Sequence, residues 1–231
     1  MIFKNNNVYN LVNFSSNMAD KEYLHIVAAI LVFTAVISFY PIITSGNWAI
    51  FPQMIFFSAL IVLVSVFAKK LMAYLLDSGV EHKLWFWERW GFRSHHRIQP
   101  AVPAGIILPL FFSLFSLGYL KVGTLLTYEA RALKYKAAKR FGFWSYISMS
   151  EWHHALIGAA GIVCVLILGA FTYFLPFNNM EYLAKLCIYF CFWNLIPISK
   201  LDGIQIFFGS RLLWSTLAII TVILTALALM I

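Results

Sequence analysis

The chain has 231 residues, of which 62% are hydrophobic and only 11% carry a charge, and its mean hydropathy is +0.82. So much apolar surface excludes a soluble globular domain, which could not cover it with polar residues. The net charge of +8 would suggest nucleic acid as a partner of a soluble protein. In a membrane protein it indicates basic loops on the cytosolic side, so we expect a lipid bilayer around the chain and no nucleic-acid partner.

Six apolar runs approach the length of a membrane span, since a spanning helix needs about 20 mostly apolar residues. In chain order they are 24–44, 54–76, 101–121, 155–176, 182–199 and 212–231. A polar segment, 1–23, precedes the first run, and the connections between runs are too short for a separate soluble domain. We therefore predict a polar cytosolic N-terminal segment followed by one integral membrane domain, 24–231.

The third run, 101–121, has the composition of a poor helix. Pro100, Pro103 and Pro109 interrupt it, and a proline inside a helix removes a backbone hydrogen bond. Clusters of Lys and Arg flank the run on both sides. If the run turns back inside the membrane, both clusters share one face, as the positive-inside rule requires. We therefore predict that 101–121 is a re-entrant hairpin or a set of membrane-embedded strands. The other five runs then cross, with the N-terminus cytosolic and the C-terminus outside.

An aromatic cluster, Trp85-Phe86-Trp87-Glu88-Arg89-Trp90, lies between the second and third runs. Aromatic residues beside basic ones are typical of the belt at a membrane surface. The alternative is an aromatic cage that binds a ligand.

Near the end of the fifth run stands Asn194-Leu195-Ile196-Pro197-Ile198-Ser199-Lys200-Leu201-Asp202-Gly203. This stretch resembles the second signature of the site-2 proteases, which are intramembrane zinc peptidases. In that signature an Asn, a Pro three residues on and an Asp-Gly five beyond recur, and the Asp is a metal ligand. The resemblance implies an all-α polytopic membrane protein with flanking spans around a three-helix core. The core would be formed by runs 54–76, 155–176 and 182–199.

The resemblance also implies a groove that holds an extended segment of a substrate or partner. The residues that we place in this groove are Asn194, Pro197, Asp202, Gly203 and, on the small-residue helix before them, Gly158.

The first signature of that family, His-Glu-x-x-His, occurs nowhere in the chain. The order of the runs puts its place at Ser65-Val66-Phe67-Ala68-Lys69-Lys70. Ser65 then stands at the first His, Val66 at the Glu and Lys69 at the second His. A protonated lysine has no lone pair for a metal, valine is no base, and one carboxylate does not hold zinc. We therefore expect neither catalytic residues nor a cofactor at these degenerate positions.

Asp202 alone at membrane depth would be costly, and ionisable residues inside membranes usually pair with one another. Lys69 stands where the resemblance places a metal-binding His. With the third run turned back, both residues lie at the cytosolic ends of their helices. We therefore predict a Lys69–Asp202 ion pair in place of the metal, with Ser65 as a polar neighbour. The alternative is that Lys69 and Lys70 both extend to the membrane surface.

Three functions remain open, and the loss of both imidazoles and the base favours the first. It is a catalytically silent site-2-protease-like protein that binds a transmembrane segment or membrane partner without cleaving it. The second is an active intramembrane metallopeptidase with rebuilt zinc ligands, for which the candidates are Glu151, His153, His154 and Asp202. The third is a small transporter or structural membrane subunit, although few ionisable groups are available for coupling transport to an ion.

Overall fold

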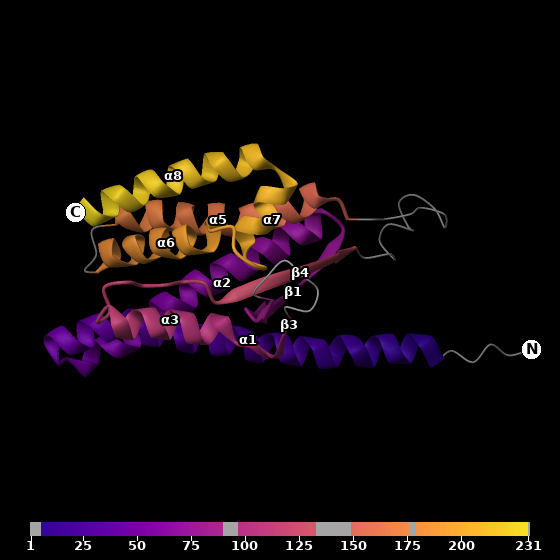
Figure 1. The fold of residues 1–231 in the computed structure, drawn as a ribbon, viewed down its shortest axis with the longest axis horizontal. Helices are drawn as coiled ribbons and strands as arrows, with labels where there is room; N and C mark the ends of the chain where they lie inside the picture. Colours follow the sequence, from indigo (N-terminus) through magenta and orange to yellow (C-terminus); the bar gives the residue numbers. More distant parts are fainter. Residues whose placement is uncertain (1–5, 90–96, 133–148, 176–178, 231) are drawn as a thin grey trace, which may run out of the picture.

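The computed structural model describes residues 6–89, 97–132, 149–175 and 179–230, and most of them are helical. The long helices lie roughly along the long axis of the molecule (Figure 1). The helices are α1 (Asn6–Ser45), a short 3₁₀ helix (Trp48–Ile50), α2 (Phe51–Leu75), α3 (Ala104–Phe115), α5 (Glu151–Tyr173), α6 (Met180–Leu195), α7 (Asp202–Gly209) and α8 (Arg211–Met230). The strands are β1 (Ser78–Leu84), β2 (Trp87–Arg89), β3 (Arg97–Val102) and β4 (Leu126–Ala132).

Within the described residues, four helices are long and apolar enough to cross a membrane: Lys21–Ser45, Trp48–Leu75, Glu151–Tyr173 and Arg211–Met230. They cover the predicted spans 24–44, 54–76, 155–176 and 212–231, apart from the last one to three residues of the latter three. Residues 176 and 231 lie outside the described part of the chain.

The fifth predicted span, 182–199, is not among these four, because α6 has only 16 residues and ends at Leu195. Pro197 accounts for the early end. The residue before a proline is disfavoured in the helical region, and Ile196 is extended, with φ −63° and ψ 126°. The chain therefore leaves the helix four residues before the predicted boundary at 199.

Helix α1 begins at Asn6, so most of the polar segment predicted for 1–23 continues the first apolar helix. Residues 1–5 lie outside the described part. Figure 1 shows that the N-terminal half of α1, in indigo, extends beyond the other helices and strands.

The fold is not all-α, because it contains two antiparallel two-stranded sheets, β1–β4 and β2–β3. These strands lie before and after 101–121 in the sequence. Only the last two residues of β3 belong to that segment. Along β1, buried and half-buried residues alternate strictly, as in a strand with one covered face. One of the buried positions is His82, so the apolar alternation that would have indicated a strand is broken in the sequence.

The part of the chain that contains 101–121 leaves the β1–β4 sheet after Leu84 and returns to it at Leu126. Because Leu84 pairs with Leu126, the two ends of this part lie side by side. Helix α3 forms the outward arm, and an extended stretch, 119–125, forms the return (Figure 1). At the turn Gly118 has φ +83°, and a Cβ there would lie 2.7 Å from the Tyr40 backbone nitrogen of α1. The path is thus out and back. Its first arm is a helix, so the embedded strands that were one alternative for 101–121 do not form that arm.

The β1–β4 pairing predicts a labelling result. Cysteines placed singly at Lys83 and Arg131, whose side chains are 37% and 57% exposed, should react with an impermeant maleimide from the same side of oriented vesicles. A cysteine at Asn47, which is exposed beyond the other end of α1, should react from the opposite side. Reaction of the first two from different sides would show that 101–121 crosses the membrane.

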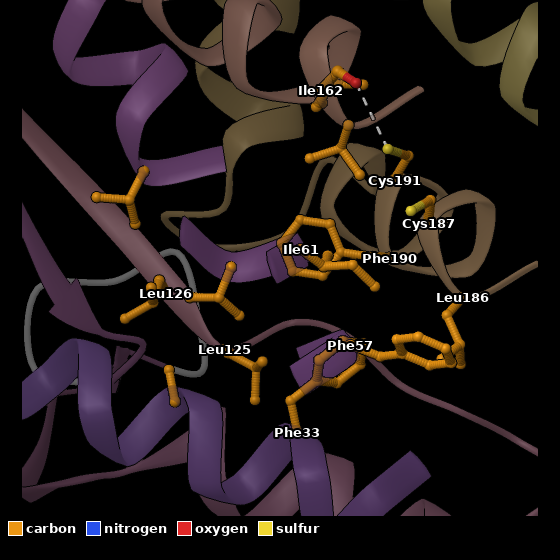
Figure 2. Close-up of a cluster of buried hydrophobic side chains, with 14 of the residues drawn as sticks. Phe33, Phe57, Ile61, Leu125, Leu126, Ile162, Leu186, Cys187, Phe190 and Cys191 are labelled. Carbon is orange, nitrogen blue, oxygen red and sulfur yellow. Dashed lines mark hydrogen bonds between the residues drawn. The ribbon is translucent and has the colours of Figure 1, made fainter. Parts of the chain in front are cut away.

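Helix α5 contacts both α2 and α6, while α1 packs on α2, and α7 and α8 pack on α5 and α6 respectively. Figure 2 shows the buried cluster where these helices meet, with Phe33, Phe57 and Ile61 facing Leu186 and Phe190. Gly169 allows the close approach of α5 to α6, since a Cβ there would lie 3.0 Å from Cys187 Cβ; small residues at such contacts favour helix association in membranes. The packing brings the ends of α2 and α6 beside the start of α7.

Candidate functional site

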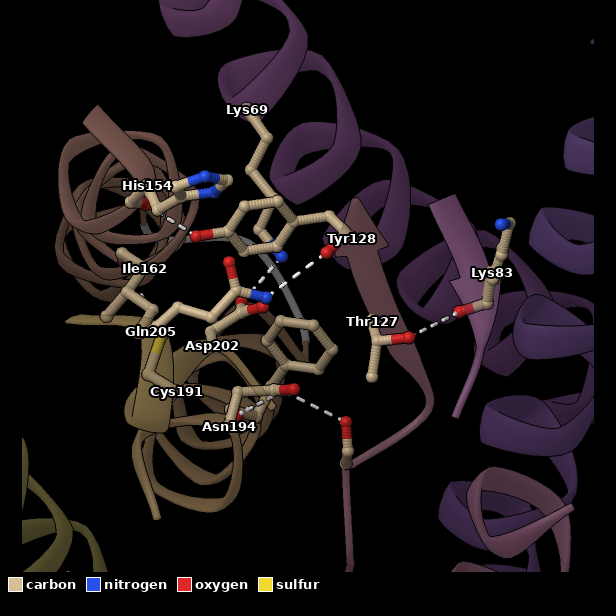
Figure 3. A network of polar contacts seen from close by, with 12 residues as sticks. Lys69, Lys83, Thr127, Tyr128, His154, Ile162, Cys191, Asn194, Asp202 and Gln205 are labelled. Carbon is tan, nitrogen blue, oxygen red and sulfur yellow. Dashed lines mark hydrogen bonds and ion pairs between the residues drawn. The ribbon is translucent and has the colours of Figure 1, made fainter. Parts of the chain in front are cut away.

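The structure brings Lys69 of α2 and Asp202 of α7 together. The Lys69 ammonium nitrogen lies 2.5 Å from Asp202 Oδ2, and the two side chains are 4% and 1% exposed. Figure 3 shows the pair enclosed between α2, α5, β4 and α7. Asp202 is the first residue of α7, where the positive end of the helix dipole also favours a carboxylate.

Two neighbours shape the route of the lysine side chain. A Cβ at Gly161 would lie 2.5 Å from Lys69 Cε, so the missing side chain leaves room for the lysine to pass along α5. The ammonium then lies 5.2 Å from the centroid of the Tyr128 ring, within the range of a cation–π interaction.

Tyr128 closes the site from the β4 side. Its hydroxyl donates to the backbone oxygen of His154 at 2.6 Å, and its own backbone oxygen accepts from Gln205 Nε2 at 3.1 Å (Figure 3). Burial and the negative charge of Asp202 raise the pKa of the Tyr128 phenol well above its usual range. The phenol therefore remains a hydrogen-bond donor, and β4 is tied to both α5 and α7.

The adjacent lysine, Lys70, turns outward. Its side chain is 46% exposed, and its ammonium lies 2.9 Å from Glu22 Oε1 of α1. The two neighbouring lysines therefore lie in different environments. Lys69 is buried against a carboxylate, and Lys70 remains at the protein surface.

His82 of β1 belongs to the same site, and the sequence did not indicate it. Glu22 Oε1 lies 3.0 Å from His82 Nδ1 and accepts from the His82 backbone nitrogen at 3.1 Å. Burial lowers the pKa of the imidazole from its ordinary value, which favours the neutral ring. A carboxylate only accepts, so the ring proton lies on Nδ1. Among the described residues, the buried Nε2 has no hydrogen-bond partner.

A small cavity of about 10 Å³ lies beside the ion pair, and its polar lining is Ser65, Lys69, His82 and Asn194. Such a volume is at the lower limit for a single water molecule. Ser65 is 4% exposed, and within the described residues no hydrogen bond joins it to Lys69 or Asp202. Val66 is 7% exposed and packs in the hydrophobic core. The three degenerate positions are thus all buried, and the space beside them is small.

Four of the five residues predicted to line a groove are buried: Gly158, Asn194, Asp202 and Gly203. The Asn194 side-chain nitrogen donates to Gly123 O at 3.0 Å and to Phe190 O at 2.8 Å, so it fastens the return stretch to α6. A Cβ at Gly203 would collide with the Leu195 carbonyl. Only Pro197 is exposed. These residues therefore make packing and hydrogen-bond contacts within the chain at the place where a groove was expected.

The alternative zinc ligands do not converge. His153 belongs to the cap of α5, where its Nδ1 lies 2.8 Å from Ser150 Oγ. Glu151 is exposed, and Asp202 is engaged by Lys69. Across the described ranges, no three His, Cys, Asp or Glu residues are grouped as metal ligands would be.

No family model matches this chain, and neither the curated proteins nor the solved structures provide a match.

Proposed function

We propose that this protein is a catalytically silent, site-2-protease-like membrane protein that binds a transmembrane segment of another protein without cleaving it. The observation that carries the proposal is the buried contact between Lys69 and Asp202. The carboxylate that the resemblance assigns to a metal has a cation against it. That cation has no lone pair with which to join a metal.

The balance of charges supports a structural role for this site. Lys69 is matched by Asp202, Lys70 is matched by Glu22, and burial favours the neutral form of His82. A catalytic zinc keeps an open position for water or substrate, whereas the cavity here has a volume of only about 10 Å³. General acid–base catalysis needs a group that can reach the substrate, and a cavity of about 10 Å³ leaves no room for a substrate.

The same proposal includes the placement in the bilayer. Helices α1, α2, α5 and α8 would span the membrane, and the shorter α6 would complete a fifth crossing together with the turn after it. The N-terminus would then be cytosolic and the C-terminus outside. In this arrangement the Lys69–Asp202 pair lies near the cytosolic surface, on the side of the basic loops.

One experiment tests the proposal with the purified full-length protein in phosphatidylcholine vesicles. The probe is a fluorescent Leu-Ala transmembrane host peptide with a Pro-Gly pair at its centre. We expect energy transfer from labelled protein to peptide, an intact peptide after prolonged incubation, and far less than one zinc per chain by elemental analysis.

The controls separate the three functions. Stoichiometric zinc that is lost in Asp202→Asn but retained in Glu129→Gln, at a carboxylate that is 41% exposed, would favour the metallopeptidase. Cleavage of the peptide would do the same. An absence of any peptide binding would favour the transporter or structural subunit.

A further inference from the structure

Lys121 is a half-buried cation that lies against aromatic rings. It stands on the return stretch, just after the turn at Gly118. Its ammonium lies 5.7 Å from the ring centroid of Tyr40, 5.5 Å from that of Tyr182 and 5.8 Å from that of Tyr189. We call these three rings the tyrosine cage. One ring comes from α1 and two come from α6, so the cation joins three segments that are distant in the sequence.

The tyrosine cage lies far from the Lys69–Asp202 pair. Tyr40 is close to the connection between α1 and α2, whereas Lys69 is near the other end of α2. Tyr40 stands five residues before the end of α1, which corresponds to about 7.5 Å of helix. In the proposed placement, the cage is therefore in the half of the bilayer away from the cytosol, below the lipid headgroups. Basic residues are uncommon on that side, and an ionisable group at membrane depth usually has a partner or a function.

The charge of Lys121 has no anionic partner within the described residues. An ammonium carries three hydrogen-bond donors, and no hydrogen bond or ion pair to Lys121 is found in this part of the chain. The neighbouring cation Lys185 repels it. Lys185 has a carboxylate of its own, since its ammonium lies 3.1 Å from Glu181 Oε1. Two lysines thus share one acidic residue here, which leaves one positive charge in excess.

A partner can reach this cation from the side of the protein. Lys121 is only half-buried, and the two residues before it, Tyr119 and Leu120, are 70% and 48% exposed. Charge complementarity calls for an anion. The depth below the headgroups calls for an anion that an apolar segment carries into the bilayer. A carboxylate in a transmembrane helix meets both conditions, because it is costly at that depth until it pairs with a cation.

We infer that Lys121 pairs with an aspartate or glutamate of a partner's transmembrane segment, in the half of the bilayer away from the cytosol. The tyrosine cage already holds the ammonium, so little side-chain freedom remains to be lost on binding. The phosphate of a lipid, the other common anion of a membrane, lies at the surface and not at the depth of the cage. The inference rests on the proposed function and specifies the chemistry by which the partner is recognised.

The test uses the purified full-length protein in phosphatidylcholine vesicles at slightly alkaline pH, with two fluorescent peptides. Both are the Leu-Ala transmembrane host peptide with the central Pro-Gly pair. Five residues from one end, one peptide carries Asp and the other carries Asn, so the two differ only in charge. From titrations of energy transfer, we expect the Asp peptide to bind about tenfold more tightly, as one hydrogen bond between charged groups would provide.

Three variants separate the charge of Lys121 from its surroundings. Lys121→Met should remove the preference for the Asp peptide, whereas Lys121→Arg should retain it. Lys185→Gln is the matched control, because it removes a cation on the same side that has its own carboxylate, and it should leave the preference unchanged. The Asn peptide should bind equally to the wild type and to every variant, which also shows that each variant is folded.

The possible outcomes are distinguishable. Equal binding of the Asp and Asn peptides to the wild type would overturn this inference and leave the proposed function standing. A preference that survives in Lys121→Met, or that disappears in Lys185→Gln, would overturn it as well. The absence of binding by either peptide would overturn both. Stronger labelling next to Lys121 by a diazirine-bearing phosphatidylglycerol than by the matching phosphatidylcholine, without a preference for Asp, would identify a lipid phosphate as the occupant and overturn the inference.

Discussion

Replacing Lys69 with methionine should destabilise the folded protein by about 3–5 kcal/mol, the usual cost of leaving one partner of a buried ion pair without the other. Methionine keeps an unbranched apolar stem to pack beside Gly161, so the main loss is the charge that faces Asp202. Asp202 Oδ1 already has no hydrogen-bond partner among the described residues. The remaining carboxylate would then be buried without compensation. The free energy of unfolding, measured by denaturant titration in mixed micelles, gives the effect.

Two further variants isolate the charge. Lys83→Met breaks a pair with Glu129 whose side chains are 37% and 41% exposed, and it should cost no more than about 1 kcal/mol. Combining Lys69→Met with Asp202→Leu should recover most of the lost stability, since a buried pair can often be replaced by apolar residues at little cost. A double variant as unstable as the single one would show that the charge of Lys69 is not what matters.

Replacing Gly203 with alanine should have the second large effect, of at least about 3 kcal/mol. Overpacking usually costs about 1–3 kcal/mol and more where the surroundings cannot move. Here the added methyl group would collide with the backbone carbonyl of Leu195 at the end of α6, and backbone atoms yield less readily than a side chain. The start of α7, which carries Asp202, would have to move away from α6. Thermal unfolding and unfolding free energy both report the change.

Gly46→Ala is the matched control for this substitution. A Cβ at Gly46 would have no atom within 4 Å, so only its φ of +64° opposes alanine, at about 1–2 kcal/mol. A loss at Gly203 no greater than the loss at Gly46 would contradict the close packing of α6 against α7.

The neighbouring residues Asp202 and Gly203 therefore have separate structural roles. The aspartate provides the charge that Lys69 meets, and the glycine allows α7 to begin directly against the end of α6. Together they position the turn at Pro197 between α6 and α7.

Much of the helical architecture could be predicted because it depends on local properties. Long apolar runs form helices wherever water is absent. Pro197 ends one of these helices, whereas Pro41 and Pro109 lie inside α1 and α3. Few charges lie in or near these runs, so few residues could pair with Asp202. Lys69 was the one expected at the same depth in the membrane. The same reasoning placed the boundary of the fifth run too late, because its apolar composition continues beyond the proline.

The parts that were missed depend on long-range contacts. His82 and Glu22 are separated by 60 residues and meet only because α1 packs beside β1. The strand β1 carries Ser, Glu, His and Lys, so its sequence lacks the apolar alternation that indicates a strand. The groove role of Asn194 was also inferred from the local sequence alone. In the structure, the Asn194 side-chain amide donates to Gly123 O of the same chain, 71 residues away.

By itself, the sequence indicated a membrane protein, where most of its apolar helices lie, and which two opposite charges near the ends of these helices had to be reconciled. These properties follow from hydropathy, proline geometry and the cost of an unpaired charge in a bilayer, all of which act within a short stretch of chain. Only the tertiary structure decided that the substituted site leaves a cavity of only about 10 Å³ and that His82 and Glu22 adjoin it. Those features arise where segments distant in the sequence pack together, and the shape of the space between them depends on side chains from several elements at once.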